Sequence, residues 1–339
     1  MNQWLKLNRM SALKMKLFIA GLAINILTIP IHVQAQTQMS FPSKPISLVV
    51  PYAPGGPTDA MARTLANAIK PPLGQVMVVE NKAGAGANIG AEYVARSEAD
   101  GYTLMFGTSA PLAINISLYK KIGYDPLKSF APIIKIGHLP NVLVVHPSVP
   151  VQNVKELIAY AKANPGKLSY ASSGSGASSH LAGVMFNMRT GTDIQHIPYK
   201  GTGPALNDLL GGQVTMSFTD VLTALPHIKA GKLKVLSVTS GTRSKILPDV
   251  PTLMEQGVSN FDVSVFFAIM APAHTPKDVI KKLNSAFATV MQDPEVRKNL
   301  EAQGLEIATQ TSSEDLAKFI RVELDQWRKV IKVSGAQAD

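Results

Sequence analysis

Short strand-like runs alternate with alanine-rich helical patterns along most of this chain, and that alternation limits the possible folds more than any other feature. Residues 46–50 form an apolar run rich in β-branched side chains, which is typical of a buried strand. A helical pattern follows, with Met61 and Leu65 on one face, and the Pro71-Pro72 pair is expected to close it. Repeated units of strand, loop and helix predict an α/β fold with largely parallel sheets.

The later part of the chain repeats this arrangement. Asn153 and Glu156 have the spacing of a helix capping box, and helices are expected to start at Pro276 and Glu314. Further strands are predicted at residues 76–80, 103–107, 141–146, 168–171, 194–199, 214–218, 235–239 and 263–270. No low-complexity linker divides the chain, so two domains would have to be joined by strands that cross between them.

The first 35 residues have the features of a cleaved targeting segment. Four basic and no acidic residues stand in the first 16 positions, and residues 17–31 form an apolar core. This core is shorter than the roughly 20 residues that span a bilayer. Val33 and Ala35 occupy the positions that a signal peptidase recognises, so we expect a mature periplasmic protein that begins at Gln36; the alternative is an uncleaved anchor.

Composition excludes several classes of site. The chain has no cysteine, so disulfide scaffolds, thiolate metal sites and cysteine nucleophiles are excluded. The histidines after the leader do not fall at metal-ligand spacings, so neither a metal nor a cofactor is expected. The formal net charge is +10, of which +6 remains without the four basic residues of the leader, and this moderate basic excess suits an anionic partner. Because the basic residues are scattered and aromatic residues make up 6%, a small anion fits better than a nucleic acid.

Two loops share a design that suits anion binding. Residues 53–59 and residues 172–179 each stand between a predicted strand and a predicted helix, and both are rich in Gly and in Ser or Pro. Glycines allow backbone N–H groups to turn toward a ligand, and the helix N-terminus behind them adds about half a positive charge. The alternative is that both loops are ordinary turns, in which these residue types are also common.

Several residues in or near these loops are candidates for ligand contacts, and two of them have two interpretations each. Asp59 is predicted to be a helix N-cap, and could also orient its loop or accept a hydrogen bond from a ligand. His180 opens the helix after the serine loop, either as a half-buried polar residue or as a ligand contact. Thr108 and Ser109 end a strand and could supply hydroxyl contacts. Residues 82–90 fail the dinucleotide fingerprint, because Ile89 stands where the third glycine is required.

Together these patterns resemble the periplasmic receptors of the tripartite tricarboxylate transporter family, also called Bug proteins, over the whole mature chain. The segments that carry the resemblance are Pro45-Ile46, Leu48-Val49-Val50-Pro51, Pro54-Gly55-Gly56, Val79-Glu80-Asn81-Lys82 with Gly84-Ala85-Gly86, Ala99-Asp100-Gly101-Tyr102-Thr103-Leu104, Ala171-Ser172-Ser173-Gly174, Pro198-Tyr199-Lys200-Gly201 and Leu247-Pro248-Asp249-Val250-Pro251-Thr252.

The resemblance implies a type II periplasmic-binding-protein fold, in which two α/β domains are joined by crossing strands and close on a ligand. The first domain would comprise residues 36–143 and 236–339, and the second residues 144–235, after the signal peptide 1–35. The implied ligand is a small mono-, di- or tricarboxylate, bound by a monomer and delivered to membrane permease subunits. The implied ligand-binding residues are Pro54, Gly55, Gly56, Asp59, Thr108, Ser172, Ser173, Gly176, Ser178, Ser179, His180 and Asp220.

Two other functions remain open on the sequence. An exported hydrolase or transferase could use a serine of residues 172–179 with His180, although no Gly-x-Ser-x-Gly motif and no spaced acid support it. A ligand-sensing module would use the same cleft to reach a signalling partner. The sequence favours a receptor that is not an enzyme.

Overall fold

The computed structural model describes residues 41–199 and 201–338. The strands are β1 (Ile46–Val50), β2 (Met77–Asn81), β3 (Thr103–Thr108), β4 (Phe130–Val145), β5 (Ser169–Ser172), β6 (Gln195–Pro198), β7 (Met216–Asp220), β8 (Lys234–Val238), β9 (Ser264–Pro272) and β10 (Glu306–Ile307). The helices are α2 (Pro57–Ala68), α3 (Lys70–Leu73), α4 (Asn88–Ala95), α5 (Asn115–Leu118), α6 (Val154–Ala163), α7 (Ser178–Thr190), α8 (Thr202–Leu210), α9 (Val221–Lys229), α10 (Lys277–Val290), α11 (Pro294–Ala302) and α12 (Ser313–Ser334), with short turns η1 (Ala85–Ala87) and η2 (Ala110–Ile114).

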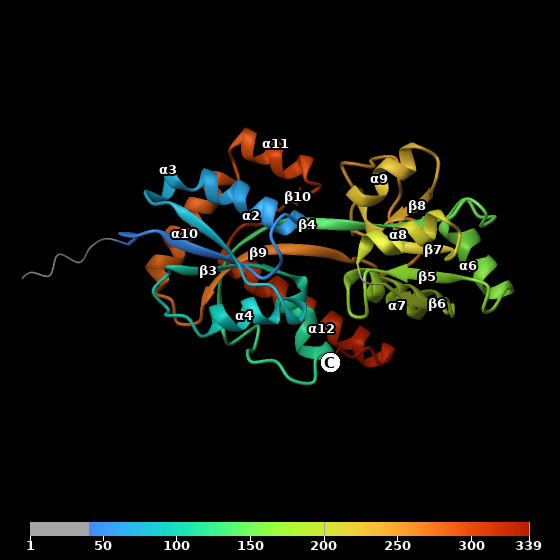
Figure 1. Ribbon diagram of the computed structural model, residues 1–339, viewed down its shortest axis with the longest axis horizontal. Helices are drawn as coiled ribbons and strands as arrows, with labels where there is room; N and C mark the ends of the chain where they lie inside the picture. Colours follow the sequence, from blue (N-terminus) through green and yellow to red (C-terminus); the bar gives the residue numbers. More distant parts are fainter. Residues whose placement is uncertain (1–40, 200, 339) are drawn as a thin grey trace, which may run out of the picture. The chain divides into compact units, whose positions relative to one another are not determined.

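The strands form a mixed sheet in the order β2-β1-β3-β9-β4-β7-β5-β6, with β8 and β10 also paired to β4. At one end β1 runs parallel to β2 and β3, and at the other end β5 runs parallel to β6 and β7. β4 and β9 are antiparallel and lie side by side through the middle (Figure 1). The predicted parallel arrangement is therefore confirmed within each group, and antiparallel strands join the two groups.

β4 is the long strand that belongs to both groups. Its residues from Phe130 to Pro140 pair with β9, and from Asn141 to Val145 it pairs with β7. The sequence predicted a strand only at residues 141–146, so the first part of β4 was missed. Pro132 and Pro140 argue against a central strand from the sequence alone, and the register with β9 shifts next to Pro132.

Helices cover both faces of the sheet, and alternate strand residues reach different cores. Leu48 of β1 packs in one buried cluster with Met61 of α2 and Phe287 of α10. Its neighbour Val49 packs in the other cluster with Trp327 of α12. In the second group of strands, α8 and α9 contribute to the first cluster, and α6 and α7 to the second. This period of two is what a sheet buried on both faces requires.

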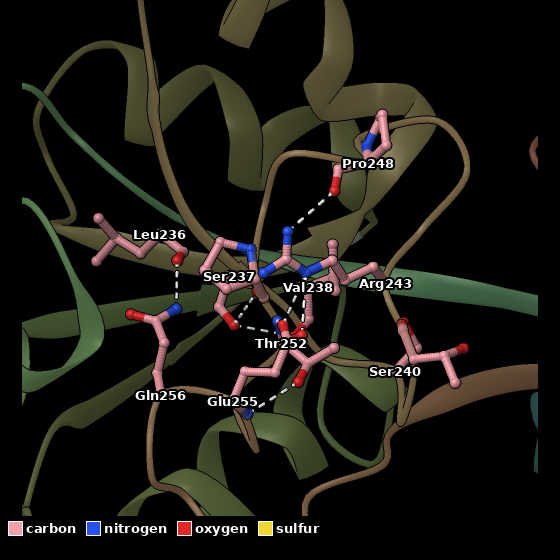
Figure 2. A network of polar contacts seen from close by, with 11 residues as sticks. Leu236, Ser237, Val238, Ser240, Arg243, Pro248, Thr252, Glu255 and Gln256 are labelled. Atoms are coloured by element: carbon pink, nitrogen blue, oxygen red, sulfur yellow. Dashed lines mark hydrogen bonds and ion pairs between the residues drawn. The ribbon is translucent and has the colours of Figure 1, made fainter.

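Residues 239–263, which connect β8 to β9, fold back onto β8. Glu255 accepts hydrogen bonds from the Thr252 backbone N–H at 2.7 Å and from Arg243 Nε at 3.0 Å. The Glu255 N–H in turn donates to Thr252 Oγ1 at 3.0 Å, and Gln256 donates to the Leu236 carbonyl (Figure 2). These contacts fix the path of the chain where it returns from β8 toward β9.

Several local predictions can be compared with these elements. The capping box is confirmed, because the Asn153 side chain accepts from the Glu156 N–H at 2.9 Å. The Pro71-Pro72 pair lies inside α3 rather than closing α2, because proline is tolerated in the first turn of a helix. α11 and β10 were not predicted. The predicted leader lies outside the described residues. None of the helices described is long and apolar enough to cross a membrane.

Candidate ligand-binding site

The two predicted anion loops border one cavity of about 510 Å³. Pro57 and Thr58, at the start of α2, line it together with residues 173–178, the loop that precedes α7. The first turn of a helix leaves backbone N–H groups without intrahelical partners. Two helix N-termini from distant parts of the chain therefore border the same space.

The remaining walls combine polar groups with an apolar surface. Further polar or glycine residues of the wall are Tyr52, Gly86, Thr108, Ser109, Asn115, Tyr119 and Asp220. The apolar residues are Ala110, Ile114, Leu118, Leu139, Val265 and Phe267. An apolar surface combined with convergent polar groups is typical of small-molecule sites.

Tyr52 and Thr108 form a polar pair in this wall, with 2.6 Å between their hydroxyl oxygens. Burial raises the pKa of Tyr52 to about 12. The phenol therefore stays protonated at neutral pH and keeps a hydrogen to donate, either to Thr108 or to a ligand.

A smaller polar nook of about 170 Å³ adjoins the cavity, sharing Ser173, Ser178, Asp220 and Val265 with it. Its other lining residues are Asn141, Ser179, Thr202, Ala205, Ser217, Phe218 and Thr219. The nook thus lies at the start of α7 and α8 and at the carboxyl end of β7, where ligands of open α/β sheets commonly bind.

The loop before α7 is held in shape by its own side chains. Ser179 Oγ accepts from the Ser173 N–H at 3.0 Å, and His180 Nδ1 accepts from the Gly176 N–H at 3.0 Å. His180 must be unprotonated at Nδ1 to accept this bond. Gly176 has φ +81°, a left-handed conformation that favours glycine. These bonds fix the loop while leaving the first-turn amides of α7 available to a ligand.

Two stacked imidazoles lie behind this loop rather than in the cavity. The rings of His180 and His196 are 3.9 Å apart, and Ser172 Oγ lies 2.6 Å from His196 Nε2. Burial lowers the pKa of His180, and burial together with the His180 charge lowers the pKa of His196 to about 4. Ser172 is 1% exposed and lines neither cavity nor nook. Ser172 is therefore buried away from a substrate, and His196 is a weak base.

Asp59 has the second of its predicted roles, because it orients its loop and is not the N-cap. Gly56 is the N-cap of α2, and Asp59 lies within the first turn, so the N-cap prediction is wrong. Its carboxylate accepts from the Gly55 N–H at 2.9 Å, from Arg63 Nε at 2.9 Å and from Asn81 Nδ2 at 2.9 Å. The Arg63 hydrogen bond is the main reason that the pKa of Asp59 falls to about 2. The side chain ties the loop to the helix and to β2.

The predicted ligand-binding residues divide into three sets. Those that line the large cavity are Thr108, Ser173, Gly176, Ser178 and Asp220. Ser179 lines only the nook. Those that line neither are Pro54, Gly55, Gly56, Asp59, Ser172 and His180. As direct ligand contacts, all twelve stay predictions.

Sequence reasoning did not single out several wall residues. Tyr52, Asn115, Tyr119 and Thr219 are examples. Tyr52 and Thr219 stand at or next to strand ends, which is a signal that could have marked them. Asn115 and Tyr119 lie in and after the short helix α5, which the sequence patterns did not indicate.

The lining carries little formal charge. Among the described residues of both spaces, Asp220 is the only Asp, Glu, Lys, Arg or His side chain. Within this part of the chain, an anion would therefore have to be bound by N–H groups, hydroxyls and helix dipoles. No group of acidic, histidine or cysteine side chains suited to a metal ion is present among the described residues.

Two larger hollows lie elsewhere on the chain and differ in character. One of about 700 Å³ is lined by charged side chains of both signs, including Lys44, Arg96 and Glu98. The other, of about 640 Å³, includes Lys135, Arg297 and Glu306. Neither borders the loops 53–59 or 172–179, so the cavity between these loops is the better candidate site.

Comparison with known proteins identifies the family. Residues 61–336 match the model for the tripartite tricarboxylate transporter family receptor, named TctC. The chain belongs to this family. Protein BugT of Bordetella pertussis is 40% identical over 322 residues, which cover 95% of this chain and 98% of that protein. The family consists of substrate-binding receptors, so the chain is a receptor and not an enzyme, and the hydrolase alternative is set aside.

Solved structures agree with this assignment. Rpa4515 of R. palustris with adipate has 36% identity and a TM-score of 0.75, covering 88% of this chain and 99% of that one. The periplasmic binding protein BugD has 39% identity and a TM-score of 0.72, covering 88% and 100%. MatC from Rhodopseudomonas palustris with bound malate has 31% identity and a TM-score of 0.72, covering 86% and 100%. The expected type II periplasmic-binding-protein fold is thereby confirmed.

Proposed function

We propose that this receptor captures a small organic carboxylate in the cavity between the loops 53–59 and 172–179 and delivers it to a tripartite tricarboxylate-type membrane transporter. The observation that carries the proposal is the meeting of the α2 and α7 N-termini at one cavity. Adipate and malate in two related structures support a carboxylate as the ligand class.

The physical basis is anion binding by oriented dipoles. Each helix N-terminus carries about half a positive charge and unpaired N–H groups. Hydrogen bonds to a charged group contribute roughly 1.5–3 kcal/mol each. Three or four such bonds, from first-turn amides and from hydroxyls such as Ser173 and Ser178, could sustain micromolar affinity after the cost of association.

Ligand binding would close two domains, with the boundaries 36–143 plus 236–339 and 144–235. The change of partner along β4, from β9 to β7 at Asn141, supports a crossing near that boundary. A ligand that contacts Thr58 on one side and Ser178 on the other bonds both only when the cavity is closed. It would therefore stabilise the closed form by its differential affinity.

The receptor would act in the periplasm after removal of residues 1–35, as a monomer without cofactor, metal or nucleic acid. The names of two related structures, a periplasmic transporter and a periplasmic binding protein, support that location. Edman sequencing of protein purified from the periplasm would test the start at Gln36; an intact leader would overturn it.

The ligand proposal is tested by thermal shift on protein purified from the periplasm, with a panel of adipate, succinate, malate, aspartate, citrate, tricarballylate, phenylacetate, mandelate and phenylglycine. A ligand at 100 times its Kd stabilises the native state by about 2.7 kcal/mol, so the melting temperature should rise by several degrees. A flat response to every acid would refute the proposal.

A matched pair of variants locates the binding event. Ser178→Ala removes a hydroxyl shared by the cavity and the nook, and should raise the Kd of the best acid at least fivefold. Ser285→Ala removes an exposed hydroxyl on α10 and should leave it unchanged. Equal effects of both substitutions would place the site elsewhere.

A further inference from the structure

Two polar residues at the carboxyl end of β7 line the nook, and neither is explained by the carboxylate capture proposed above, on which this inference rests. Thr219 and Asp220 are consecutive, and both line the space of about 170 Å³ at the start of α7. Asp220 also borders the large cavity. A ligand in the cavity can therefore reach Asp220, and Thr219 lies next to it along the strand.

Thr219 has a buried hydroxyl without a protein partner. The residue is 5% exposed, and its Oγ1 makes no hydrogen bond to any described residue. Its strand neighbour Ser217 differs, because Ser217 Oγ donates to the Ala171 carbonyl at 3.0 Å. A buried hydroxyl without a partner costs desolvation free energy, and a hydrogen bond to a ligand would offset that cost.

Asp220 retains the capacity to accept further hydrogen bonds. It is the N-cap of α9, where Oδ1 accepts from the Thr223 N–H at 2.8 Å, and the Thr223 hydroxyl lies 2.6 Å and 2.7 Å from the two carboxylate oxygens. One N–H and one O–H occupy two of about four acceptor positions of a carboxylate. The others are free to receive a donor from the cavity side.

We propose that the ligand carries a hydrogen-bond donor, a hydroxyl or an ammonium group, on the carbon next to its carboxylate, and that Asp220 and Thr219 select for this donor. The carboxylate lies at the α7 N-terminus, beside Ser173 and Ser178. The donor points at Asp220, and the Thr219 hydroxyl completes its hydrogen bonding.

The size of the nook restricts the donor to this neighbouring carbon. Ser178 and Asp220 line the same small space, which has room for only a few non-hydrogen atoms. A carboxylate at Ser178 therefore leaves its α-substituent close to Asp220, while the rest of the ligand extends into the larger cavity along Leu139 and Val265.

Charge supports the same choice. Asp220 is the only charged side chain in the described lining, so it disfavours a second anionic group beside it. A hydroxyl or ammonium group converts this repulsion into a favourable contact. Acids with hydrogen at that carbon leave the remaining acceptor positions of Asp220 and the hydroxyl of Thr219 without a partner, and a site with unpaired polar groups rejects such a ligand.

The test uses calorimetric titration with acids that differ at one position. Succinate, malate and aspartate carry hydrogen, hydroxyl and ammonium on one carbon; phenylacetate, mandelate and phenylglycine form a second series, and tricarballylate and citrate a pair. In the series that binds, the donor-bearing acid should have a Kd at least tenfold lower than its unsubstituted counterpart. A tightest ligand without a donor at that carbon overturns the proposal.

Single substitutions test whether Asp220 and Thr219 bind the donor group of the ligand. Asp220→Asn keeps an N-cap for α9 but removes the charge, and should reduce the tenfold preference to threefold or less. Thr219→Val should weaken the donor-bearing acid about tenfold, whereas Thr219→Ser, which keeps the hydroxyl, should retain its affinity. Asp193→Asn removes an exposed carboxylate outside both spaces and should change nothing. An unchanged preference in Asp220→Asn overturns the assignment.

The outcomes separate this inference from the proposed function. If no acid of the panel binds, carboxylate capture itself fails. If acids bind with equal affinity whether or not they carry the donor, capture stands and only the selection by Thr219 and Asp220 is refuted. A melting temperature of unliganded Thr219→Val well below that of the native chain would show that the hydroxyl is structural, and would also refute it.

Discussion

Substituting alanine for Gly176 tests whether the cavity walls are packed as tightly as the structure indicates. Gly176 has φ +81°, and a Cβ at this position would overlap Leu118 Cδ2 and lie 3.1 Å from Leu118 Cδ1. Both residues line the large cavity, and Leu118 is 4% exposed. Gly176→Ala therefore combines backbone strain with a steric clash across the site.

A control glycine with the same backbone angle separates the cost of backbone strain from the cost of the clash with Leu118. Gly74, the C-cap of α3, also has φ +81°, but a Cβ there meets nothing within 4 Å. Gly74→Ala should cost only the left-handed strain of about 1–2 kcal/mol. Gly176→Ala should lose a further ~1–3 kcal/mol, because Leu118 is buried and overpacking is resisted.

Urea denaturation of both variants measures this difference directly. The Kd of the best carboxylate should rise at least tenfold in Gly176→Ala and stay unchanged in Gly74→Ala. The free energy of unfolding lost in the double variant Leu118→Ala/Gly176→Ala should be smaller than the sum of the losses in the two single variants by about 1–3 kcal/mol. The reason is that truncation of Leu118 removes the clash. A loss in Gly176→Ala no larger than that in Gly74→Ala would refute the reasoning.

Two carboxyl groups give predictions with opposite pH dependence. The folded pKa of Asp59, about 2, lies below its ordinary value of 3.8, so its contribution to stability is present above pH 3.8 and is lost as pH falls through 2. Asp59→Asn should lower the free energy of unfolding, measured by urea denaturation, by about 1–2 kcal/mol at pH 7 and by less at pH 2.5. An equal loss at both pH values would contradict this prediction. Burial raises the pKa of Glu323 to about 7, so its contribution is present below pH 4.5 and is lost as pH rises through 7. Glu323→Gln, which keeps an acceptor for the Trp327 indole, should therefore stabilise the protein by about 1–2 kcal/mol at pH 8, with a smaller gain at pH 5.5; a loss at pH 8 would refute the assignment.

Strand, loop and helix units were predictable because their signals are local. The run at residues 46–50 became β1, and the Asn153–Glu156 spacing became a helix cap. The serine loop was placed correctly before α7, because a strand end followed by Gly and Ser favours this turn in any context. The family could also be named from the order of its motifs.

Other features depend on partners far away in sequence. The first part of β4, with Pro132 and Pro140, becomes a strand because β9 pairs with it. Asp59 was predicted to be a helix cap, but in the structure its carboxylate links the loop, α2 and β2. It accepts hydrogen bonds from Gly55, Arg63 and Asn81.

The sequence by itself determined the kinds of element, the position of two glycine-bearing loops before helices and the receptor family, since periodicity, glycine content and helix N-termini act over a few residues. Tertiary structure decided which of the twelve candidate residues border the cavity, and placed Tyr52 and Thr219 among the wall residues. The reason is that burial and hydrogen-bond partners are set by packing between segments more than 100 residues apart, as for Ser178 and Thr58. No local pattern records whether a hydroxyl such as that of Thr219 finds a partner in the fold or is left for a ligand.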